Sequence, residues 1–265
     1  MSGRFSRLEF DGEERKRRLS ETHAELHGTP KRDAAHYMTI ANDSRRLGLF
    51  EHALQNYTRA VREDRATVAA WVGQVQMLVE LGELAEARLW ADKALELFRD
   101  NGELLASKAQ TVVRQGDRPG GIALSDASLR SPGSSPWRWE VRGEVLVAGG
   151  EPLYRTCFQK AAAEPGADWF DQTLIATMLL LHRQAAAALE YAQRAVAQQA
   201  TAPYAWLVLG RCHAALAWDE QAETTFERCL ELTPRLEAAE LALAAIRQRG
   251  AGGRFVTRLR NWFRR

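Results

Sequence analysis

Two histidines four residues apart, His23 and His27, are the first feature of the sequence that could do chemistry. On a helix this spacing places both imidazoles on one face, and paired imidazoles can bind Zn²⁺ or a similar ion. The residues between them do not form the HExxH motif of metalloproteases, and no third ligand is evident. A solvated helix in a polar N-terminal extension explains the pair better, so the sequence predicts no metal site.

The three cysteines, Cys157, Cys212 and Cys229, are odd in number and form no CxxC pair. A disulfide framework is therefore not expected, and a reducing compartment is the simpler interpretation. Each cysteine falls where a helix carries small residues. We expect buried, inert thiols at these positions.

The glycine-rich stretches at 119–121 and 149–150 match neither GxxxxGK[ST] nor GxGxxG, so they are not phosphate-binding loops. His182 and His213 lie on expected helices and are interpreted as packing or groove residues. No cluster of residues therefore supports catalysis. The sequence predicts a non-enzymatic protein with no cofactor and no small-molecule substrate.

The last twelve residues, RFVTRLRNWFRR at 254–265, contain five arginines and no acid. Projected on a helix, the five apolar residues fall within an arc of about 120°, and every arginine lies outside it. This composition is typical of an interfacial membrane anchor. Such a short segment is expected to be helical only on contact with its surface. The proposed contact residues are Arg254, Phe255, Arg258, Leu259, Arg260, Trp262, Phe263, Arg264 and Arg265.

Three interpretations of this tail remain open. It could dock onto an anionic membrane, onto an acidic protein surface such as the protein's own concave face or a second copy, or onto nucleic acid. The last is disfavoured because residues 1–253 hold 31 basic against 34 acidic groups, so the body contributes no positive field. No stretch approaches eighteen consecutive apolar residues, and the N-terminus lacks a secretory apolar region.

The expected helices that carry these residues belong to a repeated sequence pattern. Aligned stretches beginning at residues 34, 68 and 203 share an aromatic at the fourth place and small residues at the twentieth and twenty-seventh. The first two stretches also carry a glycine at the fifteenth place, where a helix would end. The shared residues are Tyr37, Trp71 and Trp206 at the fourth place, Ala53, Ala87 and Ala222 at the twentieth, and Ala60, Ala94 and Cys229 at the twenty-seventh.

This pattern resembles the tetratricopeptide repeat family, whose repeat is a pair of antiparallel helices. The last repeat matches best, through Trp206, Leu209, Gly210, Ala222, Phe226 and Pro234. We expect an all-α, right-handed α-solenoid, in which Trp71, Trp139 and Trp206 are core residues. The period gives about six repeats, at 34–67, 68–101, 102–135, 136–168, 169–202 and 203–236.

The flanks of the repeats are expected to differ from them. Residues 1–33 form a polar N-terminal extension, and residues 237–249 form a capping helix that ends before Gly250. Residues 250–265 are then a glycine-rich spacer followed by the basic amphipathic tail. The third and fourth repeats are degenerate and are joined by SPGSSP at 131–136, so the two halves are expected to flex.

The resemblance also implies where a ligand would bind. In this family the first helix of each repeat lines a concave groove with its positions 2, 5, 9, 12 and 13. A subclass grips peptide carboxylates with lysine and asparagine, but here Met38 replaces the lysine beside Asn42, so that use is not expected. The implied groove residues are Met38, Asn42, Arg45, Arg46, Val72, Gln76, Glu80, Gln110, Arg114, Trp137, Glu140, Glu144, Phe170, Thr173, Thr177, Tyr204, Leu207 and Arg211.

These features predict a non-enzymatic adaptor that binds a protein or peptide in its groove and is localised or assembled through its tail. The alternatives are a regulatory subunit of a neighbouring enzyme complex, or a tail that docks on an acidic protein. The expected location is cytoplasmic, with peripheral attachment to the inner face of a membrane if the tail binds lipid.

Overall fold

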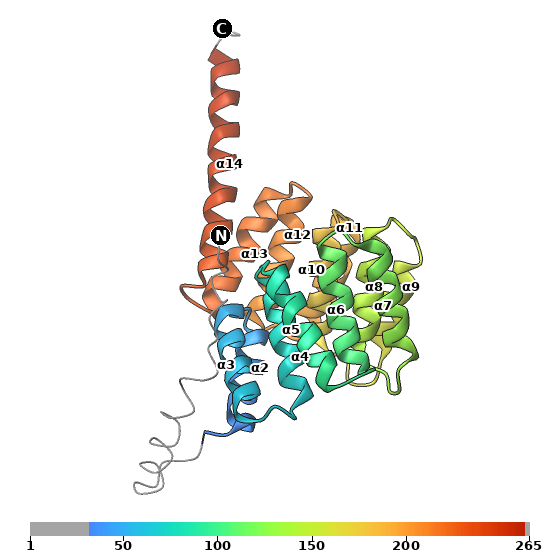
Figure 1. The fold of residues 1–265 in the computed structure, drawn as a ribbon. Coiled ribbons are helices and arrows are strands. Elements are labelled where there is room, and N and C mark those ends of the chain that lie inside the picture. Colours follow the sequence, from blue (N-terminus) through green and yellow to red (C-terminus); the bar gives the residue numbers. More distant parts are fainter. Residues whose placement is uncertain (1–31, 263–265) are drawn as a thin grey trace, which may run out of the picture. The chain divides into compact units, whose positions relative to one another are not determined.

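A computed structural model describes residues 32–262 of the chain and the side chains of residues 32–249. The described residues form thirteen α-helices and no strand, which confirms the predicted all-α fold (Figure 1). Twelve of the helices are consecutive pairs. They are α2 (Ala34–Arg46) and α3 (Phe50–Glu63), α4 (Val68–Glu80) and α5 (Leu84–Leu97), α6 (Gly102–Arg114) and α7 (Arg118–Arg130), α8 (Pro136–Ala148) and α9 (Tyr154–Ala163), α10 (Trp169–Leu181) and α11 (Ala185–Gln198), and α12 (Pro203–Ala215) and α13 (Asp219–Leu232).

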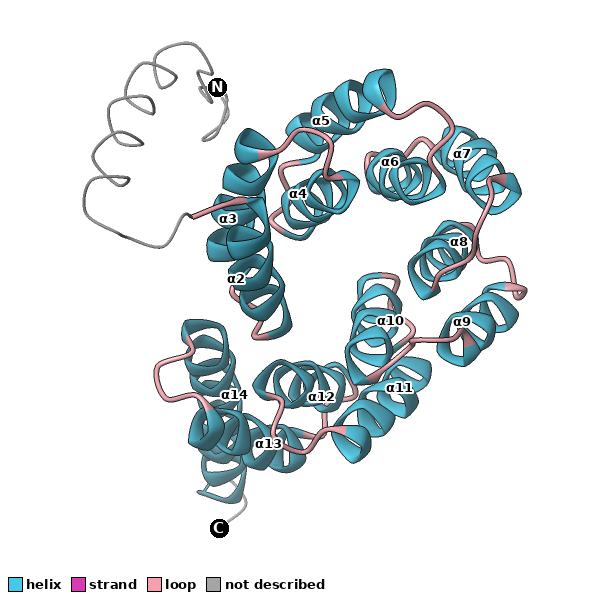
Figure 2. Ribbon diagram, turned by 90° about the horizontal axis from the view of Figure 1, so that it is seen from below, coloured by secondary structure: helices cyan, strands magenta, loops and turns pink. Residues whose placement is uncertain are grey.

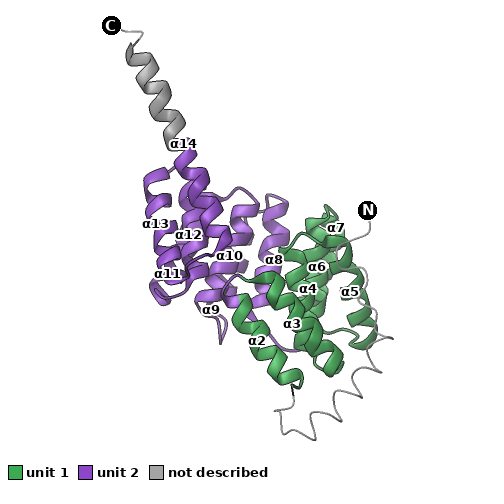
Figure 3. Cartoon of the chain, turned by 90° about the vertical axis from the view of Figure 1, so that its left-hand side faces the viewer, with its two compact units in different colours: residues 1–45, 49–131 green, residues 46–48, 132–265 purple. Residues whose placement is uncertain are grey.

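The chain divides into two compact units at Ser131 and Pro132, within the SPGSSP segment (Figure 3). The described part of the first unit is residues 32–45 and 49–131; the second is residues 46–48 and 132–262. The segment is anchored by Arg138, whose Nη1 donates to the carbonyl oxygens of Pro132 at 3.0 Å and Gly133 at 2.5 Å. Flexing of the two halves stays a prediction.

Within each unit the first helices of successive pairs pack side by side (Figure 2). In the first unit α4 contacts α6, and in the second unit α10 contacts both α8 and α12. Because each of these helices is covered on two sides by its neighbours, much of its surface is buried.

The turn between the two helices of a pair has the same backbone conformation in all six pairs. Residue fifteen has a positive φ at Gly48, Gly82, Gly116 and Gly150, as the turn glycines predict. The last two pairs adopt the same conformation without glycine, since Arg183 and Ala217 have φ of 59° and 58°. A residue other than glycine at this place therefore has a higher backbone conformational energy, but the turn keeps its conformation.

Glycine and aromatic residues form the tightest contacts of the core. A Cβ added at Gly143 would lie 2.4 Å from the Phe158 ring, and one at Gly210 would lie 2.4 Å from Phe226. Both rings are almost fully buried. The close approach of the two helices in each of these pairs therefore depends on the absence of a side chain.

The three tryptophans predicted to be core residues differ in burial. Trp71 is buried and lies 6.0 Å from Trp90, between ring centroids. Trp139 and Trp206 are only half-buried, so their assignment to the core is wrong. Lys160 Nζ lies 4.3 Å from the centroid of the Trp139 ring, and Trp206 Nε1 donates to the Ala200 carbonyl at 2.8 Å. Both indoles thus keep one side toward solvent.

The last helix, α14 (Glu237–Trp262), covers the end of the second unit. Its buried residues Ala239, Leu243 and Ile246 supply an apolar face, while Arg247 binds Glu223 at 2.7 Å and Glu227 at 2.6 Å. An apolar face of this kind covers the end of a repeat array.

The predicted end of this helix before Gly250 is wrong, because α14 continues through residues 250–253 to Trp262. Glycine costs a helix about 1 kcal/mol relative to alanine but keeps its backbone hydrogen bonds, and no proline interrupts the run. The tail therefore extends an existing helix and needs no separate nucleation. Within residues 32–262, no helix is both long and apolar enough to cross a bilayer.

Candidate functional site

Half of the predicted groove residues lie inside the protein. Close packing between the first helices of neighbouring pairs encloses them, so they present no open surface to a ligand. The nine buried residues are Gln76, Gln110, Trp137, Glu140, Glu144, Phe170, Thr173, Tyr204 and Leu207. The nine that keep partial or full exposure are Met38, Asn42, Arg45, Arg46, Val72, Glu80, Arg114, Thr177 and Arg211.

Several of these polar side chains are engaged within the protein. In the first unit Arg114 Nη2 lies 3.1 Å from Glu80 Oε1, and Tyr57 donates its hydroxyl to Asn42 Oδ1 at 2.7 Å. In the second unit Glu144 Oε1 lies 3.6 Å from His182 Nε2. The ion pair of Arg114 with Glu80 and the hydrogen bond of Tyr57 with Asn42 provide partners for polar groups on packed helices.

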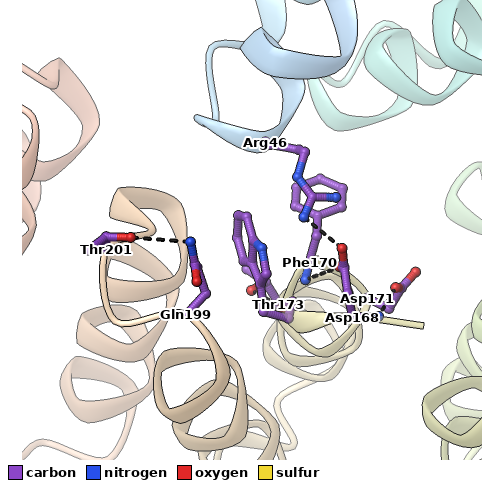
Figure 4. A network of polar contacts seen from close by, with 8 residues as sticks. Arg46, Asp168, Phe170, Asp171, Thr173, Gln199 and Thr201 are labelled. Carbon is purple, nitrogen blue, oxygen red and sulfur yellow. Dashed lines mark hydrogen bonds and ion pairs between the residues drawn. The ribbon is translucent and has the colours of Figure 1, made fainter. Parts of the chain in front are cut away.

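Three of the predicted residues meet in the second unit: Arg46 is accessible, whereas Phe170 and Tyr204 beside it are buried. Figure 4 shows Arg46 and Phe170 with the polar residues around them. The Arg46 guanidinium donates from Nη2 to Asp168 Oδ2 at 2.6 Å. Its Cζ lies 4.7 Å from the centroid of the Trp169 ring and 5.4 Å from that of Phe170. Phe170 in turn lies 6.1 Å from Tyr204. We call Arg46, Asp168, Trp169, Phe170 and Tyr204 the arginine–aromatic cluster.

The cluster is positioned by the first turn of α10. Asp168 is the N-cap: its Oδ1 accepts from the backbone N–H of Phe170 at 2.7 Å, while Asp171 Oδ2 accepts from the backbone N–H of Asp168 at 2.7 Å. This capping box fixes the Asp168 carboxylate at the positive end of the helix dipole. The two aromatic side chains that follow it are fixed by the same turn.

The backbone after Arg46 is held by close contact with Tyr204. Gly48 has φ of 79°, and a Cβ added there would lie 2.7 Å from Cδ2 of the Tyr204 ring. Only glycine fits both the conformation and the space. The Tyr204 hydroxyl oxygen also lies 3.4 Å from the hydroxyl oxygen of Thr177.

The cluster has the chemistry of a binding site rather than of a catalyst. The side chains of Arg46 and Asp168 are 39% and 41% exposed, so a ligand can reach both. A guanidinium has five N–H donors and binds planar anions such as carboxylates, and stacking on aromatic rings fixes its orientation. An acidic or aromatic side chain of a partner would therefore find a matching surface here.

Sequence reasoning identified Arg46, Phe170 and Tyr204 but missed Asp168 and Trp169. The capping box at 168–171 is a recognisable helix start, and it could have drawn attention to Asp168. The ion pair itself joins residues 122 positions apart, which no local pattern reports. The possible metal pair His23 and His27 lies outside the described residues, as do the side chains of the tail.

All three cysteines are buried and free, as expected. Burial raises the pKa of Cys212 to about 12 and that of Cys229 to about 11. Because the thiolate is the reactive form and both thiols are buried, we predict very slow reaction of either thiol with a disulfide reagent in the native protein near neutral pH. The measurement is thiol titration, and full reaction should follow addition of denaturant. Rapid native labelling of Cys212 would contradict the prediction.

The same shifts predict how stability changes with pH. A thiol whose pKa is higher in the folded state favours folding while it stays protonated. The contribution of Cys212 is therefore complete below the ordinary value of 9.0 and is lost as the pH rises toward about 12.

Comparisons with known proteins agree with this architecture. Residues 203–236 match the family model described as tetratricopeptide repeat. A tetratricopeptide repeat protein from Parabacteroides merdae is 15% identical, with a TM-score of 0.53, and the alignment covers 85% of this chain and 89% of that one. No curated protein sequence matches the chain.

Two further solved structures share the fold. Yeast Tom70 is 14% identical with a TM-score of 0.55, over 90% of this chain and 52% of its own. Human IFIT1, solved as a dimer with m7Gppp-AAAA, is 17% identical with a TM-score of 0.53, over 90% of this chain and 61% of its own. The chain thus spans little more than half of these two proteins. Residues 203–236 thus match one tetratricopeptide repeat, and the chain shares the fold of these solved structures.

Proposed function

We propose that this protein is a non-enzymatic adaptor that binds a protein or peptide partner at the arginine–aromatic cluster. Tetratricopeptide repeat proteins generally mediate protein–protein or peptide interactions. The observation that carries the proposal is the Arg46 guanidinium, stacked on two aromatic rings and paired with Asp168 while more than a third of its side chain stays exposed. Arginine and tryptophan in such surroundings are the residues that most often dominate binding energy.

The chemistry of the cluster defines the partner. A carboxylate of the partner would accept from guanidinium donors that the ion pair with Asp168 leaves available, and an apolar or aromatic side chain would pack against Trp169. The partner segment is therefore acidic and carries a bulky apolar residue. The family resemblance and the absence of a basic field on the body support a protein ligand over a nucleic acid.

The proposal predicts that Arg46→Ala weakens partner binding by about 2 kcal/mol or more, which is about thirtyfold. The partner is first identified by crosslinking and mass spectrometry in the native host, and its affinity is then measured by calorimetry. Arg228→Ala is the matched control, because Arg228 is similarly exposed and pairs with Glu231 at 2.6 Å, away from the cluster. Equal affinities of the two variants would refute the proposed site.

We also propose that the C-terminal tail attaches the adaptor to an anionic membrane. The separation of five apolar residues from five arginines around the helix supports this over docking on an acidic protein. Because α14 joins the tail to the cap as one helix, the backbone of the tail has less ordering entropy to lose than a disordered segment would. This location would be peripheral.

A further inference from the structure

A separate pocket of about 170 Å³ opens in the first unit among α3, α4 and α5. It contains none of the predicted groove residues, and the proposed adaptor function does not use it. An apolar base and a charged rim, with two cations and one anion, surround it. These residues are Leu54, Leu78, Trp90, Arg59, Arg62 and Glu86. An engineered apolar cavity of about 150 Å³ binds benzene, so one aromatic ring is a suitable guest for this volume.

Gln74 marks the pocket as a binding site. Its side chain lines the pocket and is 1% exposed, yet neither Nε2 nor Oε1 has a hydrogen-bond partner among the described residues. A buried amide left in this state costs about 1–3 kcal/mol, which a leucine would avoid. Leu209 occupies the same position of the last repeat. The polar residue at position 74 therefore costs stability that a bound ligand would recover.

The two unpartnered atoms indicate what the ligand is. A carboxamide that needs one acceptor and one donor is complementary to a peptide unit, which offers a C=O and an N–H. The ligand is therefore a polypeptide segment whose backbone passes Gln74 and whose aromatic side chain enters the apolar base.

We propose that this segment is the chain's own N-terminal extension, with Phe10 as the residue that enters the pocket. The described residues begin at Arg32, five residues before Tyr37. Arg59, on the rim, has its Cζ 5.8 Å from the centroid of the Tyr37 ring, near the start of α2. The 21 residues between Phe10 and Arg32 can span up to roughly 70 Å when extended, at about 3.3 Å per residue, so they are long enough for Phe10 to reach the pocket.

Charge and connectivity favour this occupant over a separate molecule. Phe10 lies between Glu9 and Asp11, and the rim provides two arginines, Arg59 and Arg62, against one glutamate. A segment tethered beside its site also has an effective concentration in the millimolar range for a short flexible linker, so even a weak contact would be populated. The extension would then act as a strap across the first two repeats.

Hydrogen exchange with mass spectrometry on the full chain tests this proposal. The backbone amides around Phe10 should exchange at least about tenfold more slowly than in a synthetic peptide of residues 1–31. The slowing should be lost in Gln74→Met, which keeps the length of the side chain but removes its amide. The matched control is Gln172→Met in the second unit, because Gln172 is 4% exposed and its Oε1 also lacks a partner. This control should retain the slowing.

A second variant keeps the test independent of folding. Phe10→Ala lies outside the repeats, so it should abolish the slowing while the circular dichroism and melting of the repeats stay those of a folded array. Exchange as fast as in the free peptide, or slowing that survives both Phe10→Ala and Gln74→Met, would overturn the proposal. Slowing that increases with protein concentration would also overturn it, in favour of a second copy as the occupant. Neither result depends on Arg46 or on the adaptor function.

Discussion

Replacing Phe158 by alanine is expected to lower the free energy of unfolding by about 3–5 kcal/mol. The Phe158 ring is fully buried between α8 and α9, and its centroid lies 5.9 Å from that of Tyr154 and 6.2 Å from that of Tyr191, both edge-on. Removing the ring creates a cavity and abolishes both aromatic contacts. Urea denaturation followed by circular dichroism measures the loss, and a loss below about 1 kcal/mol would contradict the packing described.

The contact between Phe158 and Gly143 makes this prediction sharper. Gly143→Ala alone should cost about 1–3 kcal/mol, because the new methyl group would lie 2.4 Å from Cε1 of the ring. In a Phe158→Ala background the same change should cost almost nothing, since the space is vacant. The double-mutant cycle should therefore give a coupling energy of about 1 kcal/mol or more. Equal costs in the two backgrounds would show that the glycine is not required by the ring.

Reversing the charge of the tail is expected to abolish binding to anionic vesicles. Each arginine near an anionic surface contributes about 1 kcal/mol, so the five together account for roughly a thousandfold or more in partitioning. The variant replaces Arg254, Arg258, Arg260, Arg264 and Arg265 by glutamate. In flotation with vesicles containing phosphatidylserine, the natural chain should rise with the lipid and the variant should stay at the bottom.

Two controls separate the membrane from an acidic protein surface. A chain truncated after Arg249 keeps the described cap contacts of α14 with Glu223 and Glu227 through Arg247, and it should also fail to float. Little of the natural or the truncated chain should float with vesicles of neutral lipid, because burial of apolar side chains is then the only driving force for binding. Equal recovery of the natural and truncated chains from anionic vesicles would remove the membrane from the proposal and leave the acidic protein as the target.

The sequence by itself determined the fold, because its repeating signals act within one helix pair. An aromatic at the fourth place and small residues at the twentieth and twenty-seventh recur in phase in the first, second and last repeats, and the turn at the fifteenth place is present in all six. Together they specify two helices that must pack. The turn conformation at Arg183 and Ala217 shows that these signals are redundant, since two turns form without their glycine.

Only the tertiary structure decided which side chains are available for binding. Exposure on a first helix depends on the neighbouring helices, and these enclosed Glu140 and Glu144 while leaving Arg46 accessible. The arginine–aromatic cluster joins α10 to a residue 122 positions earlier, and the pocket at Gln74 needs three helices from two repeats. Local periodicity carries no information on such contacts. They arise when the packed repeats bring distant residues together, and burial then sets the cost or gain of each polar group.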